Sequence, residues 1–164
     1  MTFSGKDAFV ALRGIIAATA FVLLWTWLAT LARAFDPEWG MTLPSWLRPV
    51  GYLLMALGAS LGATCVTVFI SRGKGTPAPF DPPRRFVATG PYRWVRNPMY
   101  CGAVGVLLGA AFVVGSSSIV LLALLFWTLA HLFVVTYEEP ALERRFGAEY
   151  VAYKAVVNRW LPRL

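Results

Sequence analysis

The sequence predicts an all-α fold, a polytopic membrane bundle of four transmembrane helices in one domain, 1–164. Hydrophobic residues make up 58% of its 164 residues, and the mean hydropathy is +0.62. Soluble domains contain only about 45 to 50% apolar residues, so the composition argues against a soluble protein. Four apolar segments follow one another along the chain, and basic residues gather in alternate connections between them.

Each apolar segment is expected to form one helix. A helix needs about 20 residues to cross the hydrocarbon core. The first, second and fourth segments reach this length, whereas the third is short and is expected to begin or end below the membrane surface. A Gly-Ser-Ser-Ser turn separates the last two segments and predicts a helical hairpin. The expected spans are residues 9–35, 46–70, 99–114 and 116–137.

Basic residues predict the orientation of the bundle. They are frequent at the N-terminus, in the connection 71–98 and in the tail 138–164, whereas the opposite connections hold only Arg33 and Arg48. Because cytoplasmic loops carry the excess of Lys and Arg, both termini and the connection 71–98 are expected in the cytoplasm, with the protein in an inner or plasma membrane. The net charge of +7 follows from this topology and suits anionic lipid headgroups, and no nucleic-acid motif accompanies it.

The long connection and the tail have different patterns. Glycines and prolines deny regular structure to 71–98, and its aromatic residues predict a lid docked at the membrane interface, the alternative being a disordered loop. The fourth helix is expected to end or kink at Pro140. Beyond it, apolar residues at three- and four-residue spacing predict an amphipathic helical tail on the cytoplasmic face, with Gly147 as a candidate interruption.

Small residues within the spans are interpreted as structural. Pairs of glycines four residues apart permit close approach of two helices. The two cysteines lack metal-ligand spacing, so neither a metal site nor a disulfide is expected. These residues are Gly58 and Gly62, Gly105 and Gly109, and Cys65 and Cys101.

Two polar clusters flank the last two spans. Residues 90–100 contain Arg93 and Arg96 beside two prolines, and Glu138-Glu139-Pro140 ends the fourth span. Charge that is half-desolvated at a membrane edge is costly unless it is paired or binds something. Because the predicted topology puts both clusters on one side, they predict a site for a charged cofactor.

An ordered set of residues in the second half of the chain carries a family resemblance. It consists of Gly90-Pro91-Tyr92, Arg96-Asn97-Pro98-Met99-Tyr100, Gly102, Glu138-Glu139, Phe146-Gly147, Glu149-Tyr150, Tyr153 and Leu161-Pro162. The pattern resembles the membrane methyltransferase superfamily of isoprenylcysteine carboxyl methyltransferases and phospholipid N-methyltransferases. The resemblance implies S-adenosylmethionine as the methyl donor, S-adenosylhomocysteine as the product, and a lipid-like acceptor that arrives from the membrane.

The resemblance and the chemistry of the donor together suggest the site residues. A carboxylate can accept from the ammonium or ribose hydroxyls of the donor, and an arginine can pair with its carboxylate. Only one of two successive glutamates need face the pocket, because neighbouring helical residues point about 100° apart. His131 lies two turns before Glu138 on much the same helix face, although another helix can equally well satisfy it. The expected cofactor-binding residues are Tyr92, Arg93, Asn97, Pro98, Tyr100, His131, Glu138, Glu139, Tyr150 and Arg159.

Two residues are candidates for catalysis. Arg96 is expected to orient an anionic acceptor, and Glu139 is the candidate base for an amine or phenol acceptor. Asn97 stands where the isoprenylcysteine enzymes typically have histidine, which excludes a proton-carrying role at that position. Val156 stands where those enzymes are expected to have an arginine, which weakens the case for a prenylcysteine carboxylate. The function expected from the resemblance is methyl transfer from S-adenosylmethionine to a lipophilic or membrane-associated acceptor, similar to that of isoprenylcysteine carboxyl methyltransferases. The alternatives are a phospholipid headgroup amine, a small thiol and a non-catalytic lipid-binding scaffold.

Overall fold

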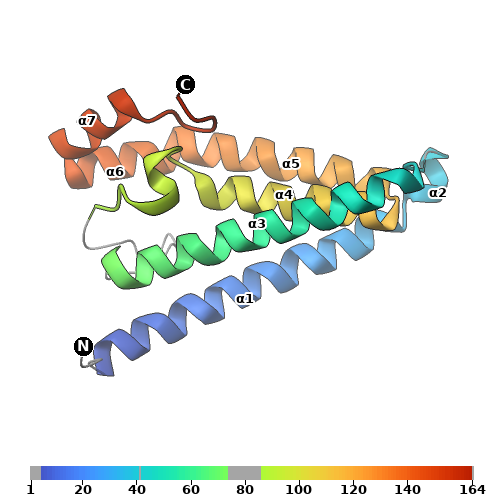
Figure 1. The fold of residues 1–164 in the computed structure, drawn as a ribbon, viewed down its shortest axis with the longest axis horizontal. Coiled ribbons are helices and arrows are strands. Elements are labelled where there is room, and N and C mark those ends of the chain that lie inside the picture. The colour runs from blue at the N-terminus through green and yellow to red at the C-terminus, as the bar shows by residue number, and fades with distance from the viewer. Residues whose placement is uncertain (1–4, 41, 74–85, 164) are drawn as a thin grey trace.

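The computed structural model describes residues 5–40, 42–73 and 86–163, and the regular secondary structure in these ranges is helical apart from one isolated β-bridge between Thr42 and Ser116. The middle of the expected lid, residues 74–85, lies outside the described residues. Figure 1 shows an elongated bundle of long helices, with α6 and α7 at one end and α2 at the other. The α-helices are α1 (Gly5–Arg33), α2 (Asp36–Trp39), α3 (Arg48–Val68), α4 (Pro98–Val114), α5 (Ser117–Phe133), α6 (Glu139–Phe146) and α7 (Ala148–Val156). Shorter 3-10 turns span Ser45–Leu47 and Gly90–Arg93, and π-helical turns span Phe69–Gly73 and Val134–Glu138.

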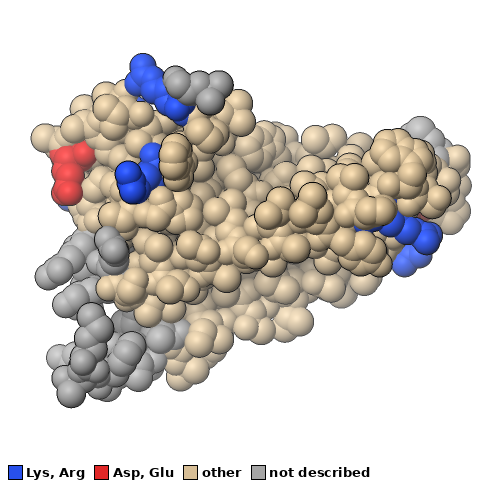
Figure 2. Space-filling model, in the orientation of Figure 1, with Lys and Arg blue, Asp and Glu red and all other residues tan. Residues whose placement is uncertain are grey.

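Three helical stretches are long and apolar enough to cross a membrane: Leu12–Glu38, Ser45–Ser71 and Ser117–Phe146. Pro98–Val114 is a shorter apolar helix, as the sequence predicts for the third segment. On the face drawn in Figure 2, charged side chains lie at the two ends of the molecule and leave its middle uncharged. The chain is therefore an all-α protein with the helices of an integral membrane bundle.

Glycines bring α3 and α4 into backbone contact. A Cβ at Gly58 would lie 2.5 Å from the carbonyl oxygen of Gly102, and one at Gly109 would lie 2.6 Å from the carbonyl oxygen of Gly51. Close approach of this kind replaces side-chain packing with direct backbone packing, which is common between membrane helices. The expected packing role holds for Gly58 and Gly109, whereas a Cβ at Gly62 would meet nothing within 4 Å.

A compact turn at the α2 end connects α4 to α5. Gly115 has a φ of +75°, which suits the sharp reversal of a helical hairpin. Ser116 caps α5 by accepting from the backbone N–H of Ile119 at 3.2 Å. Asp36 in turn accepts from the Ser116 hydroxyl and from the Ser118 backbone N–H, both at 2.9 Å. The predicted hairpin is present, and the α1–α2 segment is tied to its tip.

Helix α1 packs on the bundle through aromatic side chains. The rings of Trp25 and Phe126 meet edge to face with centroids 4.6 Å apart, and Phe21 approaches the same ring at 6.0 Å. Phe126 belongs to a buried cluster with Leu107 between α4 and α5. Much of the rest of α1 is exposed apolar surface, which suits contact with lipid chains.

The fourth helix does not end where the sequence predicts. The chain stays helical from Ser117 to Phe146, and the expected break or kink at Pro140 takes the form of a π-helical turn at Val134–Glu138 just before it. A wider turn of this kind can absorb the loss of the hydrogen bond that proline cannot donate. The helical break falls instead at Gly147, with φ +55°, the candidate interruption named above.

Substituting Gly58 by Ala should loosen the α3–α4 contact. The added Cβ would overlap a backbone oxygen that cannot move independently, so we expect the variant to lose about 1 to 3 kcal/mol of stability. Gly62→Ala is the matched control, since its Cβ meets open space and alanine favours the helix by up to about 1 kcal/mol. Thermal unfolding in detergent measures both, and equal stability of the two variants would contradict the packing argument.

Candidate functional site

One carboxylate organises the end of the bundle where α4 begins and α5 continues into α6. Glu139 Oε1 accepts from Arg159 Nε at 2.8 Å, and its Oε2 accepts from Arg159 Nη2 at 2.9 Å. Arg96 Nη2 lies 2.9 Å from the same Oε1 atom. The side chains of Glu139 and Arg96 are only 10% and 9% exposed. Two arginines from distant parts of the sequence thus share one nearly buried counter-ion.

Residues 157–160, which we call the C-terminal strap, bring Arg159 to this position. The strap leaves α7 in an extended conformation, with Val157 at φ −114° and ψ +124°. Arg96 donates its backbone N–H to the Asn158 carbonyl at 2.9 Å, and the Asn97 amide donates to the Arg159 carbonyl at 3.3 Å. The strap is therefore fastened to the segment that precedes α4.

The Arg96 guanidinium also reaches α7 by donating from Nη1 to the Lys154 carbonyl at 3.2 Å. Its Nε is buried and has no hydrogen-bond partner within the described residues. A buried donor without a partner is costly in free energy and marks a place where a ligand acceptor would fit.

Glu138 has different surroundings from Glu139. Its Oε2 accepts from the Tyr100 hydroxyl at 2.9 Å, which joins the start of α4 to the end of the π-helical turn. Among the described residues, no arginine or lysine forms an ion pair with Glu138. The adjacent glutamates therefore have different partners: Glu139 pairs with the arginines and Glu138 with the Tyr100 hydroxyl.

His131 belongs to an aromatic group deeper in the bundle. Its Nδ1 accepts from the indole N–H of Trp160 at 3.1 Å. The Trp160 ring lies 4.4 Å from that of Trp127 and 6.4 Å from that of Tyr100, measured between centroids. We call Tyr100, Trp127, His131 and Trp160 the aromatic group. His131 thus lies on the same side as Glu138 but bonds to the strap.

Tyr153 of α7 contacts the described end of the expected lid. The buried Tyr153 hydroxyl donates to the Tyr92 carbonyl at 2.6 Å, and Phe86 packs edge to face on Tyr153 with centroids 5.0 Å apart. Burial raises the pKa of Tyr92, Tyr150 and Tyr153, so these phenols stay protonated. The described end of the expected lid is therefore docked onto α7.

The hydrogen bonds of Arg159 to Glu139 raise the pKa of its guanidinium, although partial burial opposes the shift. A guanidinium is already charged at any physiological pH. Acid–base change at this cluster therefore does not involve Arg159, and its contribution is a fixed positive charge.

The structure gathers most of the predicted site residues but not all of them in one contact network. Pro98 is fully buried in the first turn of α4, and Tyr150 is fully buried in α7. Arg93 is exposed on the 3-10 turn that precedes Arg96. Direct side-chain contacts join Arg96 and Arg159 to Glu139. A separate contact joins Tyr100 to Glu138. Asn97 and His131 reach these groups through the strap, at the Arg159 carbonyl and the Trp160 ring, and the Tyr92 carbonyl is held by Tyr153.

Sequence reasoning missed the two tryptophans of the aromatic group. Trp127 lies one helical turn before His131, a spacing that places both on one face of α5. Trp160 follows Arg159 directly, and no local pattern shows that it folds back against α5. Only the first of these residues carried a signal in the sequence.

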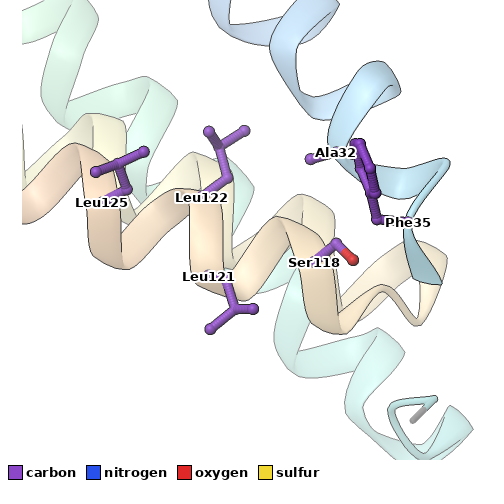
Figure 3. Close-up of a pocket in the computed structure, with 6 residues that line it drawn as sticks. All are labelled: Ala32, Phe35, Ser118, Leu121, Leu122 and Leu125. Atoms are coloured by element: carbon purple, nitrogen blue, oxygen red, sulfur yellow. The ribbon is translucent and has the colours of Figure 1, made fainter. Parts of the chain in front are cut away.

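An apolar groove lies at the opposite end of the bundle, where α1 meets α5 (Figure 3). Ser118 in this groove is 20 residues before Glu138, or about 30 Å along a continuous helix. The groove is thus separate from the charged site. Its lining residues are Ala32, Phe35, Ser118, Leu121, Leu122 and Leu125.

Comparison with known families identifies the chain. The family model of phospholipid methyltransferases matches residues 46–149, well over half of the chain. This protein belongs to the phospholipid methyltransferase family. No individual curated protein matches the chain. The matched range includes Arg96, Glu138 and Glu139, whereas the strap lies beyond it.

Membership of this family establishes the class of the protein. It is a membrane methyltransferase, and the family implies a lipid acceptor. Methyltransferases of this family generally use S-adenosylmethionine. No group of three potential metal ligands occurs among the described residues. Because family membership makes the protein a methyltransferase, the alternative of a non-catalytic scaffold is set aside.

Replacing Glu139 by Gln should destabilise the site end of the bundle. Two guanidinium groups would lose their shared counter-ion, and an unpaired buried charge costs about 3 kcal/mol or more. Glu143→Gln is the matched control, because the Glu143–Lys154 pair is exposed and worth at most about 1 kcal/mol. We expect thermal unfolding in detergent to separate the two variants, and similar melting temperatures would contradict the assigned role.

Proposed function

We propose that the protein transfers a methyl group from S-adenosylmethionine to the amine of a phospholipid headgroup. The observation that carries the proposal is Glu138, a carboxyl group bound by a tyrosine hydroxyl and without an arginine partner among the described residues. A nearby carboxylate without a counter-ion favours a cationic acceptor such as a protonated amine.

The residues of the site fit S-adenosylmethionine. The donor carries an ammonium, a carboxylate and ribose hydroxyls beside its sulfonium. The buried Arg96 offers its unpartnered Nε to the carboxylate of the donor. Asn97 and Tyr92, which lie on the segment that the strap fastens, would complete the binding surface. When bound, this donor supplies an electrophilic methyl group.

Glu138 suits the role of proton acceptor better than Glu139. Both oxygens of Glu139 already accept hydrogen bonds from guanidinium groups, so this residue is expected to hold the strap in place. Glu138 accepts one hydrogen bond from Tyr100 and retains lone pairs for a substrate proton. An amine acceptor must lose its proton before its nitrogen can form a bond to the methyl carbon, and Glu138 is placed to take it.

The same arrangement argues against an anionic acceptor. Arg96, expected from the sequence to orient such an acceptor, is committed to Glu139 and to the Lys154 carbonyl. Orientation of the reactants supplies much of the rate in a direct displacement, so the acceptor must be held by other groups. The remaining guanidinium nitrogen of Arg96, its Nε, is assigned to the donor carboxylate, so Arg96 is not left to bind a prenylcysteine carboxylate or a small thiolate.

We infer that four helices span the membrane and that the site faces the cytoplasm. The cluster around Glu139 lies at the end rich in basic residues, whereas the α2 end holds Arg33 and Arg48 beside Asp36. This asymmetry supports cytoplasmic termini by the positive-inside rule.

Calorimetry and methyl transfer test the proposal together. Purified protein in detergent should bind S-adenosylhomocysteine and, in vesicles, transfer a labelled methyl group to phosphatidylethanolamine. Binding of the product without transfer to this lipid would contradict the amine acceptor, and absence of binding would contradict the donor. A prenylcysteine or small thiol methylated faster than the phospholipid would support the competing acceptors.

Replacing Glu138 by Gln should reduce kcat by about 100-fold or more, the usual contribution of a general base. The amide keeps a carbonyl oxygen that can accept from Tyr100, so the fold should persist. Its activity should recover in part at higher pH if it is the removal of the amine proton that Glu138 assists. A pH–rate profile that is parallel to that of the wild type would count against proton transfer at Glu138.

A further inference from the structure

Two consecutive residues of the strap point to different parts of the site. Arg159 pairs with Glu139 in the charged cluster, whereas Trp160 lies in the aromatic group against α5. The strap therefore connects the charged half of the site to its apolar half, and no function described above uses Trp160.

Trp160 is held firmly for a residue of an irregular segment. Its ring packs on Trp127 with centroids 4.4 Å apart and donates its N–H to His131 at 3.1 Å. Its carbonyl accepts from the Cys101 thiol at 3.9 Å. Since indole nitrogen is only a donor, the bond requires an unprotonated Nδ1 on His131. Two of these contacts hold the ring against α5, and the third holds the Trp160 backbone against α4.

The aromatic group lies deeper along the bundle than the acidic residues. His131 precedes Glu138 by seven residues, which corresponds to about 10 Å along a helix. The nearby Leu129 and Leu132 of α5 are 51% and 52% exposed, as expected for side chains that face lipid. Trp160 itself is partly exposed. The aromatic group is consequently accessible from an apolar environment.

Tyr100 links this group to the chemistry. Its ring lies 6.4 Å from Trp160, and its hydroxyl donates to Glu138. The aromatic group contains no arginine, lysine or acidic residue, whereas the donor carries several charged groups that match the Arg96–Glu139–Arg159 cluster. An acceptor with an apolar body and a polar head is the partner that matches the aromatic group.

We propose that Trp160 is a positioning residue for the lipid acceptor. Its ring, held by His131 and Trp127, contacts the glycerol and upper acyl region of a phospholipid, so that the headgroup lies beside Tyr100 and Glu138. The inference rests on the proposed function and adds the residue that sets the depth of the acceptor. Trp160 forms no bond with the reacting atoms.

Kinetics with both substrates test this role. Trp160→Phe keeps a ring but loses the N–H, and the loss of one hydrogen bond should raise KM for phosphatidylethanolamine in vesicles about two- to tenfold. Trp160→Ala should raise it further. KM for S-adenosylmethionine should stay within about twofold in both. Trp46→Phe is the matched control, because Trp46 is 70% exposed and lies near the opposite end of the bundle.

His131 variants separate positioning from mere packing. His131→Leu removes the acceptor of the indole N–H, whereas His131→Asn places an amide oxygen close to the position of Nδ1. KM for the lipid should therefore be lower in the Asn variant than in the Leu variant. Combining each of these variants with Trp160→Phe should remove this difference. Equal lipid KM values for the Leu and Asn variants would contradict the hydrogen-bond role.

A donor-side role would have a different signature. If KM for S-adenosylmethionine, or the affinity for S-adenosylhomocysteine by calorimetry, changes as much as the lipid KM, the strap acts on the donor and the inference is wrong. A lipid KM in Trp160→Phe equal to that of Trp46→Phe would also overturn it.

A measurement without catalysis distinguishes failure of this inference from failure of the proposed function. Phosphatidylcholine brominated near the glycerol end of its acyl chains quenches tryptophans that contact it. The fraction of tryptophan emission lost to quenching should be larger for the wild-type protein than for Trp160→Phe in such vesicles. If the wild-type protein methylates no lipid but shows this difference, the proposed function is contradicted and the lipid contact is not. If quenching is the same in the wild-type protein and in Trp160→Phe, the lipid contact is contradicted.

Discussion

The pairing of Glu139 with Arg96 and Arg159 is the interaction on which the arrangement of the site end depends. It joins three segments that are distant in the sequence: the segment that precedes α4, the start of α6 and the strap. A carboxylate near the membrane edge is costly to leave unpaired, and so are two guanidinium groups. The cheapest arrangement brings all three together, and in doing so it folds the strap across the bundle and commits Glu139 to a structural role.

Pairing at Glu139 leaves Glu138 with a separate environment. Successive helical residues diverge by about 100°, so one glutamate meets the arginines while its neighbour meets the Tyr100 hydroxyl. The site then contains a charged half at Arg96 and an aromatic half at Trp160, with Glu138 and Tyr100 between them. A polar methyl donor and an amphipathic acceptor require this kind of division, because one arrives from water and the other from the bilayer.

Rigid helix packing supports the division. Backbone contacts between Gly58 and Gly102 fix α4 against α3, while a cap at Ser116 fixes the start of α5. The Gly58–Gly102 contact lies two residues from Tyr100, about 3 Å along α4, so it holds the site end of that helix directly. The Ser116 cap lies at the far end of α5, about 30 Å along the helix from Glu138. The irregular strap needs several hydrogen bonds to be placed as accurately, and it obtains them from the Arg96 backbone and from the side chains of Asn97 and His131.

The sequence by itself predicted the helical membrane class, the short third helix, the hairpin and the placement of the Arg96 segment and the paired glutamates at one end of the bundle. These depend on hydropathy, length and local turn chemistry, which are properties of contiguous residues. Only the tertiary structure decided that the fourth helix continues past Pro140, that Glu139 takes both arginines, and that Trp160 reaches His131. Those outcomes arise from contacts between residues far apart in the chain, where the energy of a pairing depends on which groups the fold brings within reach.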